Sequence, residues 1–452
     1  MIFFRNVLGT FITEVSIVGL NFFIGVLVAR AMSPAARGVL ALAMTLPITV
    51  AYFIDPGVSQ ANIYLFGHRR RSAEALAANS ILLALVIGVA AGLALWLGQG
   101  PLLRTLLSGL TSNQLTLLLP LLPLLLLDSY LMAILRARQQ FRLYNLKRLA
   151  TQILLLALML LVLLPMGKAA TGAILAFSLT MVLSTVLSIV LVGRTTRLRI
   201  GLQTNLAGEM VRYGLKSYVQ NLVGHLTYRL DLYLVALFLD PAQIAFYAVA
   251  TSFAELAWYV PNSVGTVLFP RLSIATTEEI HPLTAEITRH TLFVTLILTL
   301  GLAAASWIVV PLFYGPTYLP VIAPLLTLLP GVLSMTVYKV LTRNFSSRNR
   351  QQVSILASVL ALLVNVGLNV WLIPQMGIVG AAASSLVAYT LAGTILLIAF
   401  CRESGLPLHE VLLIRRADLA HYGKLVQQVK TWKHRQIRNH RSLGEVHVIG
   451  QE

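Results

Sequence analysis

The residues of this chain that could do chemistry are charged side chains set within apolar segments. The stretch YRLDLYLVALFL, residues 228–239, places Arg229 and Asp231 two positions apart at the edge of an apolar run. At 100° per residue these two lie on roughly opposite faces of a helix, so they cannot pair within it. The polar residues that share the face of Arg229 are Tyr218, Asn221, His225 and Tyr228. An arginine fork donates two parallel hydrogen bonds, so this face could present Arg229 and His225 to an anionic group such as a diphosphate.

Seven acids and bases lie inside apolar segments: Glu14, Asp55, Asp128, Arg229, Asp231, Glu255 and Lys339. Each would cost about 2.5 to 3.5 kcal/mol at the centre of an isolated membrane helix, so each needs a partner, water or a role. Asp55 precedes Pro56 and Gly57, which indicates a local helix break; a role in substrate binding is the alternative. Lys339 lies one turn before Arg343, where snorkelling to the membrane surface or substrate binding would explain it. Asp128, two turns from Arg136, is consistent with a structural role.

Arg229 and Glu255 are both placed close to the middle of the membrane. One interpretation is a buried pair in which Arg229 binds Glu255 or Asp231 and ties helices together. The other is that Arg229 binds the substrate, with Glu255, Asp231 or Glu14 carrying a coupling proton or sodium ion. The residues alone leave both interpretations open.

The composition predicts the elements that position these side chains. Only 11% of the 452 residues are charged and 57% are hydrophobic, whereas soluble domains are about 25% charged. This composition predicts an all-α polytopic membrane protein with about twelve spans of roughly 20 residues. The predicted spans are 7–29, 39–66, 77–98, 115–136, 149–166, 170–192, 215–239, 243–269, 288–312, 319–342, 352–373 and 378–400.

Basic residues predict the orientation of these spans. With the N-terminus inside, 28 of the 34 lysines and arginines fall in cytoplasmic segments and four in outer loops, which predicts that both termini are cytoplasmic. The net charge of +18 therefore indicates topology rather than nucleic-acid binding. Residues 407–440 have apolar residues at helical spacing among basic ones, which predicts an amphipathic helix on anionic inner-leaflet lipid; a solubilising tail is the alternative.

The chain also contains an internal repeat. ARAMSPAARG from Ala29 matches ALFLDPAQIA from Ala236 as the end of a span, a Pro-Ala turn and the next span, at an offset of about 207 residues counted along the chain. Each half contains six spans, which predicts two six-helix bundles related by a pseudo-twofold axis along the membrane normal. The predicted domains are residues 1–200 and 201–400, followed by the tail 401–452. The offset maps Asn221 and Tyr228 onto Glu14 and Asn21, so polar stripes of both halves could line one central cavity.

Enzymatic motifs and cofactor sites receive little support. The sequence has no GxxxxGK[ST] loop, and HEVLL at His409 lacks the second histidine of a zinc motif. The single cysteine, Cys401, excludes an intramolecular disulfide and a cysteine-based metal cluster. The predicted outer loops are short, which disfavours a polysaccharide polymerase or ligase. We expect no cofactor and no catalytic residues.

Several stretches resemble the polysaccharide-exporter and oligosaccharide-flippase family of the multidrug/oligosaccharidyl-lipid/polysaccharide (MOP) superfamily. YGLKSYVQNLVGHLTYRLDLYLVALFLDPAQ from Tyr213 is similar to the seventh and eighth helices of that family, LFYGPTYLPVIAPLLTLLPG from Leu312 to the turn into the tenth, and VNVGLNVWLIPQMGIVGAAASSL from Val364 to the last two. The resemblance covers nearly the whole chain up to Cys401. Twelve spans rather than fourteen favour this family over the peptidoglycan lipid II flippases.

The resemblance implies a transporter that moves an undecaprenyl-diphosphate-linked oligosaccharide, such as an O-antigen unit of lipopolysaccharide, outward across the bacterial inner membrane by alternating access. It transfers a cationic cavity onto Arg229 and Lys339. The predicted cavity thus contains Arg229, His225, Tyr228, Asn221, Tyr218, Glu14, Asn21 and Lys339. The main alternative is a cation-coupled multidrug exporter of the same superfamily, whose cavity would favour acids.

Overall fold

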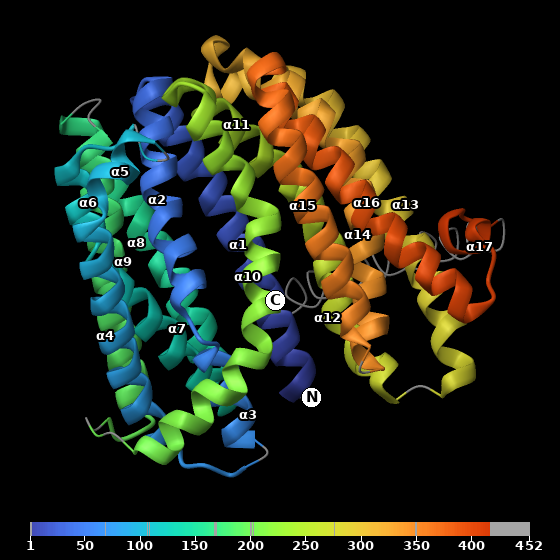
Figure 1. The fold of residues 1–452 in the computed structure, drawn as a ribbon, viewed down its shortest axis with the longest axis horizontal. Coiled ribbons are helices and arrows are strands. Elements are labelled where there is room, and N and C mark those ends of the chain that lie inside the picture. Colours follow the sequence, from blue (N-terminus) through green and yellow to red (C-terminus); the bar gives the residue numbers. More distant parts are fainter. Residues whose placement is uncertain are drawn as a thin grey trace, which may run out of the picture.

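The computed structural model describes residues 2–67, 69–105, 107, 109–166, 170–198, 201, 203–274, 276–348 and 350–415. These residues form helices and turns and include no strand. Figure 1 shows two helical bundles that lie side by side, with the first half of the chain in one and the second half mainly in the other. The N-bundle (α1–α9) and the C-bundle (α10–α17) agree with the predicted all-α, two-bundle fold.

The helices of the N-bundle are α1 (Ile2–Ala31), α2 (Pro34–Ile54), α3 (Val58–Gly67), α4 (Ala73–Leu97), α5 (Gln99–Arg104), α6 (Ser112–Leu118), α7 (Leu121–Ala137), α8 (Phe141–Met166) and α9 (Ala170–Gly193). Those of the C-bundle are α10 (Thr204–Phe238), α11 (Pro241–Glu255), η1 (Leu256–Trp258), α12 (Tyr259–Ile274), α13 (Thr277–Val309), η2 (Val310–Tyr314), η3 (Pro316–Val321), α14 (Ile322–Ser347), α15 (Gln351–Met376), α16 (Ile378–Ser404) and α17 (Leu408–Leu412).

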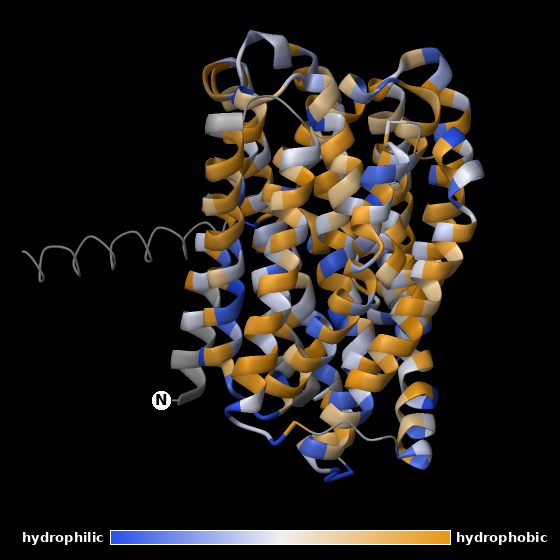
Figure 2. Ribbon diagram, turned by 90° about the vertical axis from the view of Figure 1, so that its left-hand side faces the viewer, coloured by the Kyte–Doolittle hydropathy of each residue, from blue (hydrophilic) through white to orange (hydrophobic). Residues whose placement is uncertain are grey.

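Ten segments of the described chain are long and apolar enough to span a membrane, and hydrophobic residues cover most of the length of the bundles (Figure 2). The chain is a multi-pass membrane protein. The predicted seventh and eighth spans, α10 and α11–α12, are not among the ten. α10 contains several polar residues, and the 3₁₀ turn η1 divides the eighth span into two short helices. These two spans hold three of the seven charged side chains that the sequence places in apolar segments, namely Arg229, Asp231 and Glu255.

The two bundles share one packing scheme. In the N-bundle, α1 packs on α8, α4 and α9 on α7, and α3 on α7. In the C-bundle, α10 packs on α15, α13 and α16 on α14, and α12 on α14. Each contact of the first set has its counterpart six spans later, as the predicted repeat requires.

The repeat extends to helix caps and helix breaks. Ser33 caps α2 and Asp240 caps α11, and each is followed by a proline at the first helical position, where proline fits best. The second span breaks at Asp55–Gly57, where Gly57 has a φ of +81°. The Asp55 carboxylate accepts hydrogen bonds from the Gly57 and Val58 N–H groups. The predicted helix-break role of Asp55 is confirmed.

The bundles contact each other through α2 and α11. A Cβ on Gly38 would lie 1.7 Å from the carbonyl oxygen of Pro241, so only glycine allows this approach. We use "outer end" for the end with the α1–α2 and α10–α11 turns, and "inner end" for the end with the α3–α4, α7–α8 and α14–α15 turns, after the predicted topology. At the outer end, Arg30 of α1 donates from Nε to the Phe313 carbonyl of η2 at 2.7 Å.

A second cation also closes the outer end between the bundles. The guanidinium carbon of Arg37 lies 5.0 Å and 5.2 Å from the ring centroids of Tyr314 and Tyr318, in the range of a cation–π contact. At the inner end, the long helix α10 of the C-bundle lies on α3, and a Cβ on Gly57 would lie 2.3 Å from the Gly214 carbonyl oxygen.

The chain beyond α16 is described only as far as Arg415. Its short helix α17 packs on α13, and Arg289 of α13 donates to the Glu410 carbonyl at 2.7 Å. The predicted amphipathic helix falls mainly on residues outside the described part of the chain.

Candidate functional site

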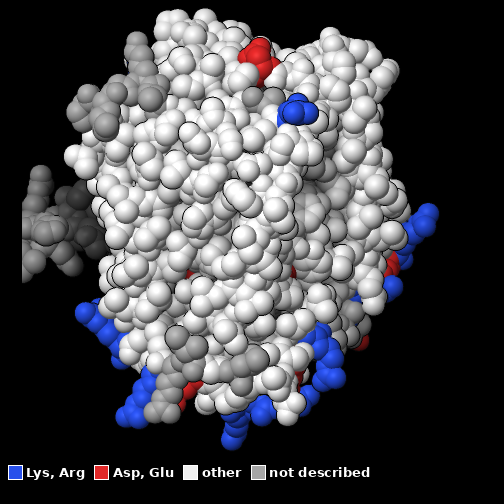
Figure 3. Space-filling model, turned by 60° about the vertical axis from the view of Figure 1, so that its left-hand side comes forward, with Lys and Arg blue, Asp and Glu red and all other residues white. Residues whose placement is uncertain are grey.

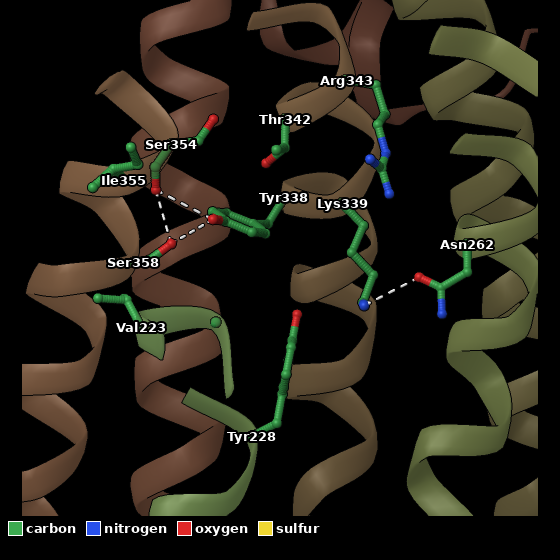
Figure 4. Close-up of a pocket in the computed structure, with 11 residues that line it drawn as sticks. Val223, Tyr228, Asn262, Tyr338, Lys339, Thr342, Arg343, Ser354, Ile355 and Ser358 are labelled. Atoms are coloured by element: carbon green, nitrogen blue, oxygen red, sulfur yellow. Dashed lines mark hydrogen bonds between the residues drawn. The ribbon is translucent and has the colours of Figure 1, made fainter. Parts of the chain in front are cut away.

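A pocket opens in the C-bundle between α10, α12, α14 and α15 (Figure 4). It has a volume of about 180 Å³. Its lining includes two cations from one helix, Lys339 and Arg343 of α14. Hydroxyl groups are contributed by Tyr228, Tyr338, Thr342, Ser354 and Ser358.

Lys339 is positioned by an amide and two aromatic rings. Its Nζ donates to Oδ1 of Asn262 at 3.2 Å and lies 5.0 Å from the ring centroid of Tyr228 and 4.8 Å from that of Trp258. These are cation–π contacts, which hold a cation without neutralising it. The predicted cavity residues Lys339 and Tyr228 therefore lie together. Snorkelling does not describe this lysine, because its ammonium group is held among side chains of the pocket (Figure 4).

Arg343 lies one turn beyond Lys339 on the same face of α14. No carboxylate lies within 4 Å of Lys339 or of Arg343 in the described part of the chain. Like charges four residues apart on a helix repel each other. The hydroxyl of Ser354 is also buried without a hydrogen-bond partner. The pocket thus combines excess positive charge with an unused hydroxyl, a combination that suits an anion.

Arg229 faces a carboxylate rather than open space. Its Nη1 and Nη2 donate to Oε1 and Oε2 of Glu255 at 3.1 and 3.2 Å. The side chains are 37% and 27% exposed, so the pair is only partly buried. In this conformation both donors of the fork are used, and the pair joins α10 to α11. Of the two interpretations, this geometry favours the helix tie, and the role of Arg229 as a substrate ligand stays a prediction.

Asp231 is buried inside the C-bundle and does not pair with Arg229. Its carboxylate accepts hydrogen bonds from the hydroxyl of Tyr247, from the hydroxyl of Ser385 at 3.3 Å and from the N–H of Leu232 at 2.8 Å. Ser385 in turn accepts a bond from Asn365, and Asn365 accepts one from Asn369. Asp231 is therefore a carboxylate held only by neutral donors.

The other predicted residues of α10 contact the N-bundle instead of the pocket. His225 forms a 2.9 Å hydrogen bond with the hydroxyl of Thr49 and stacks on the ring of Tyr52. Tyr218 donates to the Phe53 carbonyl at 2.7 Å. These contacts join α10 to α2. The side chain of Asn221 lies outside the described part of the structure.

Glu14 and Asn21 lie on the face of α1 that packs on α8. Nη2 of Arg148 donates to Oε2 of Glu14 at 3.0 Å and Nη1 donates to Oε1. Gln152 donates to the side-chain oxygen of Asn21. Glu14 is thus paired with a base of its own bundle. Asp128 is likewise paired, but its partner is Lys147 at 2.6 Å rather than Arg136.

The sequence reading missed Arg343, Asn262, Ser354 and Ser358 as site residues. Arg343 had a usable signal, because two bases four residues apart lie on one helix face and no acid follows them on that face. Asn262, Ser354 and Ser358 had none, since only the packing of α12 and α15 on α14 brings them together.

Basic side chains gather at the inner end of the molecule. Figure 3 shows most of the visible lysines and arginines at the lower edge of one face, and a broad uncharged surface above them. This distribution fits the predicted orientation, which stays a prediction. Arg343, which lines the pocket, lies in the last turns of α14, toward the same basic end.

The fold of two helical bundles, with a polar pocket inside the C-bundle, is shared with transporters of the MOP superfamily. The structure is similar to a lipid II flippase MurJ in an inward closed conformation, with a TM-score of 0.71 and 16% identity over 87% of this chain and 89% of that one. It is also similar to an inward-facing multidrug resistance MATE family transporter, with a TM-score of 0.67 and 15% identity over 85% and 94%. A third similar structure is a MOP superfamily transporter from Pyrococcus furiosus, with a TM-score of 0.62 and 17% identity over 89% of this chain and 95% of that one.

The family model described as lipid II flippase MurJ matches residues 52–431, and the chain belongs to that family. No curated protein matches the chain significantly. The predicted superfamily is confirmed, and membership in a family of transporters excludes the enzymatic alternative. The expectation that twelve spans separate the chain from the lipid II flippases was wrong, because the family model that matches is that of a lipid II flippase.

Proposed function

We propose that this protein is a flippase for a polyprenyl-diphosphate-linked saccharide. The observation that carries the proposal is the pair of uncompensated cations, Lys339 and Arg343, that lines the C-bundle pocket. A diphosphate offers several anionic oxygens that a lysine and an arginine can bind together. The family name supports a lipid-linked substrate.

The pocket supplies donors beyond the two cations. The free hydroxyl of Ser354 can donate to a phosphate oxygen, and the Ser358 hydroxyl lies next to that of Tyr338. The aromatic rings of Tyr228 and Trp258 keep the Lys339 ammonium group in place before the substrate arrives. Binding is stronger when the donors are already in place, because fewer side chains have to be ordered when the substrate binds.

The contacts between the bundles are consistent with entry from the inner end. The outer end is closed by Arg30 on the η2 carbonyls and by Arg37 on the rings of Tyr314 and Tyr318. In the proposed cycle the diphosphate binds in the pocket while the polyprenyl tail stays in the bilayer. The halves, residues 1–200 and 201–400, then rock, and the outer contacts open to release the saccharide.

The finer proposal is that the saccharide is an undecaprenyl-diphosphate-linked unit for the bacterial cell surface, moved outward across the inner membrane. Lipid II and the oligosaccharide units of surface polysaccharides, O-antigen included, share the polyprenyl diphosphate that the pocket would bind. In this proposal Lys339, Arg343 and the pocket hydroxyls bind the diphosphate that these substrates share.

A cation-coupled multidrug exporter is the second candidate, favoured by the structural likeness to MATE transporters. Its cavity should offer unpaired carboxylates to a cationic drug. Glu14 and Glu255 are both engaged in two-point pairs with arginine. The cations of the pocket would repel such a drug, so we favour the flippase.

Coupling to an ion gradient is also part of the proposal. Among the three predicted coupling residues, Glu14 and Glu255 are neutralised by arginine, whereas Asp231 is held only by hydroxyls and a backbone N–H. Asp231 is therefore the carboxylate best placed to exchange a proton or a sodium ion.

The experiment is a flipping assay in proteoliposomes with a fluorescent undecaprenyl-diphosphate disaccharide. The double variant Lys339→Gln with Arg343→Gln should lose flipping by at least about tenfold, since each charge-assisted bond contributes about 1.5–3 kcal/mol. A matched control is Arg194→Gln with Arg197→Gln, which removes two charges from an exposed inner loop. Undiminished flipping by the pocket variant, or transport of a cationic dye instead, would refute the proposal.

A further inference from the structure

The N-bundle contains a cationic cluster at the counterpart of the pocket. The helices α10, α14 and α15, which line the pocket together with α12, correspond in packing to α1, α7 and α8. On these three helices lie Arg136 at the end of α7, Tyr144 and Arg148 on α8, and Glu14 on α1. We call these four residues the N-bundle cluster.

Both arginines of the N-bundle cluster lie over the same aromatic ring. The guanidinium carbon of Arg136 is 5.7 Å from the ring centroid of Tyr144, and that of Arg148 is 5.5 Å from it. Cation–π contacts position the guanidinium groups and leave their charges in place. The ring thus brings two positive charges together.

The cluster has one carboxylate for two guanidinium groups. Glu14 binds Arg148 at both of its oxygens. Arg136 has no carboxylate within 4 Å in the described structure, and its Nε is buried without a hydrogen-bond partner. The nearby Lys147 is already paired with Asp128. One positive charge and at least one donor are therefore uncompensated.

Glu14 and Arg148 of the N-bundle cluster lie near the C-bundle. The hydroxyl of Tyr259, at the start of α12, is in electrostatic range of both residues and of Glu255 of its own bundle. Tyr259 is 39% exposed, and the side chains of Glu14 and Arg148 are 38% and 28% exposed. Arg148 is therefore partly exposed on the side of the N-bundle that is close to α12.

We propose that Arg136 and Arg148 form a second anion-binding subsite, which recognises an acidic group on the saccharide. The inference rests on the proposed function, in which Lys339 and Arg343 hold the diphosphate. The bundle opposite the diphosphate would then face the sugar end of the headgroup. A carboxylate or phosphate on the sugar fills the vacancy beside Arg136 and competes with Glu14 for Arg148. The substrate class is consequently an acidic, not a neutral, lipid-linked saccharide.

The test compares two synthetic ligands that differ in one group: undecaprenyl-diphosphate disaccharides that end in glucuronic acid or in glucose. Binding is measured with purified full-length protein in phosphatidylcholine nanodiscs, which contain no anionic lipid. The wild type should bind the acidic ligand about tenfold more tightly, as one charge-assisted hydrogen bond allows. Arg136→Gln should reduce this ratio to about one, and Arg136→Lys should retain part of it.

The controls separate this inference from the proposed function. Arg138→Gln removes a neighbouring inner-end arginine that donates to Thr196, and it should keep the wild-type ratio. Lys339→Gln with Arg343→Gln should weaken both ligands and keep the ratio. If that double variant binds both ligands normally, the proposed function fails while the ratio still tests the second subsite.

Two results would overturn the inference. One is equal binding of both ligands by the wild type; the other is a loss in Arg136→Gln that is the same for both. An anionic phospholipid headgroup shares the chemistry of the acidic sugar. If the wild type shows no preference and Arg136→Gln instead lowers the binding of phosphatidylglycerol, the cluster holds a lipid, and the substrate assignment is overturned.

Discussion

The two bundles have the same packing scheme, but each holds a carboxylate of its interior in a different way. In the N-bundle, the partly buried Asp128 receives a salt bridge from Lys147 at 2.6 Å and a hydrogen bond from Ser188 at 2.6 Å. In the C-bundle, the buried Asp231 receives hydrogen bonds only from neutral donors, namely Tyr247, Ser385 and a backbone N–H. The N-bundle pairs its acid with a base and the C-bundle does not.

Cations show the same difference. Arg148 of the N-bundle is neutralised by Glu14, whereas Lys339 and Arg343 of the C-bundle pocket have no acid within 4 Å among the described residues. Arg136 is the exception in the N-bundle. A buried charge without a partner lowers the stability of the folded protein. The repeat thus preserves the packing scheme, whereas the C-bundle leaves the two cations of its pocket without a carboxylate partner in the described part of the chain.

The largest expected effect on stability concerns Asp128, the acid that is paired with a base. Lys147→Ala removes the partner of Asp128 from a site where the lysine is 5% exposed, and should cost about 3–5 kcal/mol of unfolding free energy. Thermal or denaturant unfolding in detergent measures it. The second change Asp128→Asn should recover most of the loss. If Lys147→Ala is neutral, the N-bundle is not held by this pair and the comparison fails.

A smaller loss of stability is expected for Asp231, the acid that has no base as a partner. Asp231→Asn keeps the shape of the side chain and leaves no base unpaired, so stability should fall by only about 1–2 kcal/mol, the net worth of the hydrogen bonds changed. Transport should lose its dependence on a proton or sodium gradient if Asp231 carries the coupling ion. A stability loss as large as that of Lys147→Ala would contradict the assigned difference between the two acids.

The Arg229–Glu255 pair should contribute less to the unfolding free energy than either of the two acids, because it is partly exposed. Arg229→Ala is expected to reduce stability by about 1 kcal/mol, measured in the same unfolding assay, and Arg229→Ala with Glu255→Ala should restore it. Flipping then separates a helix tie from a ligand. Normal flipping in the double variant would mean that Arg229 only joins α10 to α11, whereas persistent loss would assign it to the substrate.

The smallest stability effect is expected for the two cations of the pocket. Lys339→Gln with Arg343→Gln relieves a like-charge repulsion of about 0.2–0.5 kcal/mol but also removes the contacts of Lys339 with Asn262 and two aromatic rings. The two effects oppose each other, so the unfolding free energy should change by less than about 1 kcal/mol, while flipping should be lost. Destabilisation as large as that of Lys147→Ala would contradict the view that these cations lack a carboxylate partner.

The sequence by itself determined the membrane class and the repeat. Apolar runs of about 20 residues predict helices because a bilayer leaves no water for backbone groups, so local composition is enough. The matching Pro-Ala turns at Pro34 and Pro241 were predicted correctly, each as the start of the next helix. The helix break after Asp55 was also readable, because Pro56 removes a backbone donor wherever it lies.

Only the tertiary structure decided which charges are paired. Arg229 could pair with Glu255 or Asp231 by sequence, and the packing of α11 on α10 selected Glu255 while Tyr247 and Ser385 took Asp231. His225 shares a helix face with Arg229, yet it binds α2, through a hydrogen bond with Thr49 and stacking on Tyr52. A helix face fixes the direction of a side chain, but its partner comes from another helix many residues away. Pairing therefore depends on contacts of long sequence separation, which no local pattern encodes.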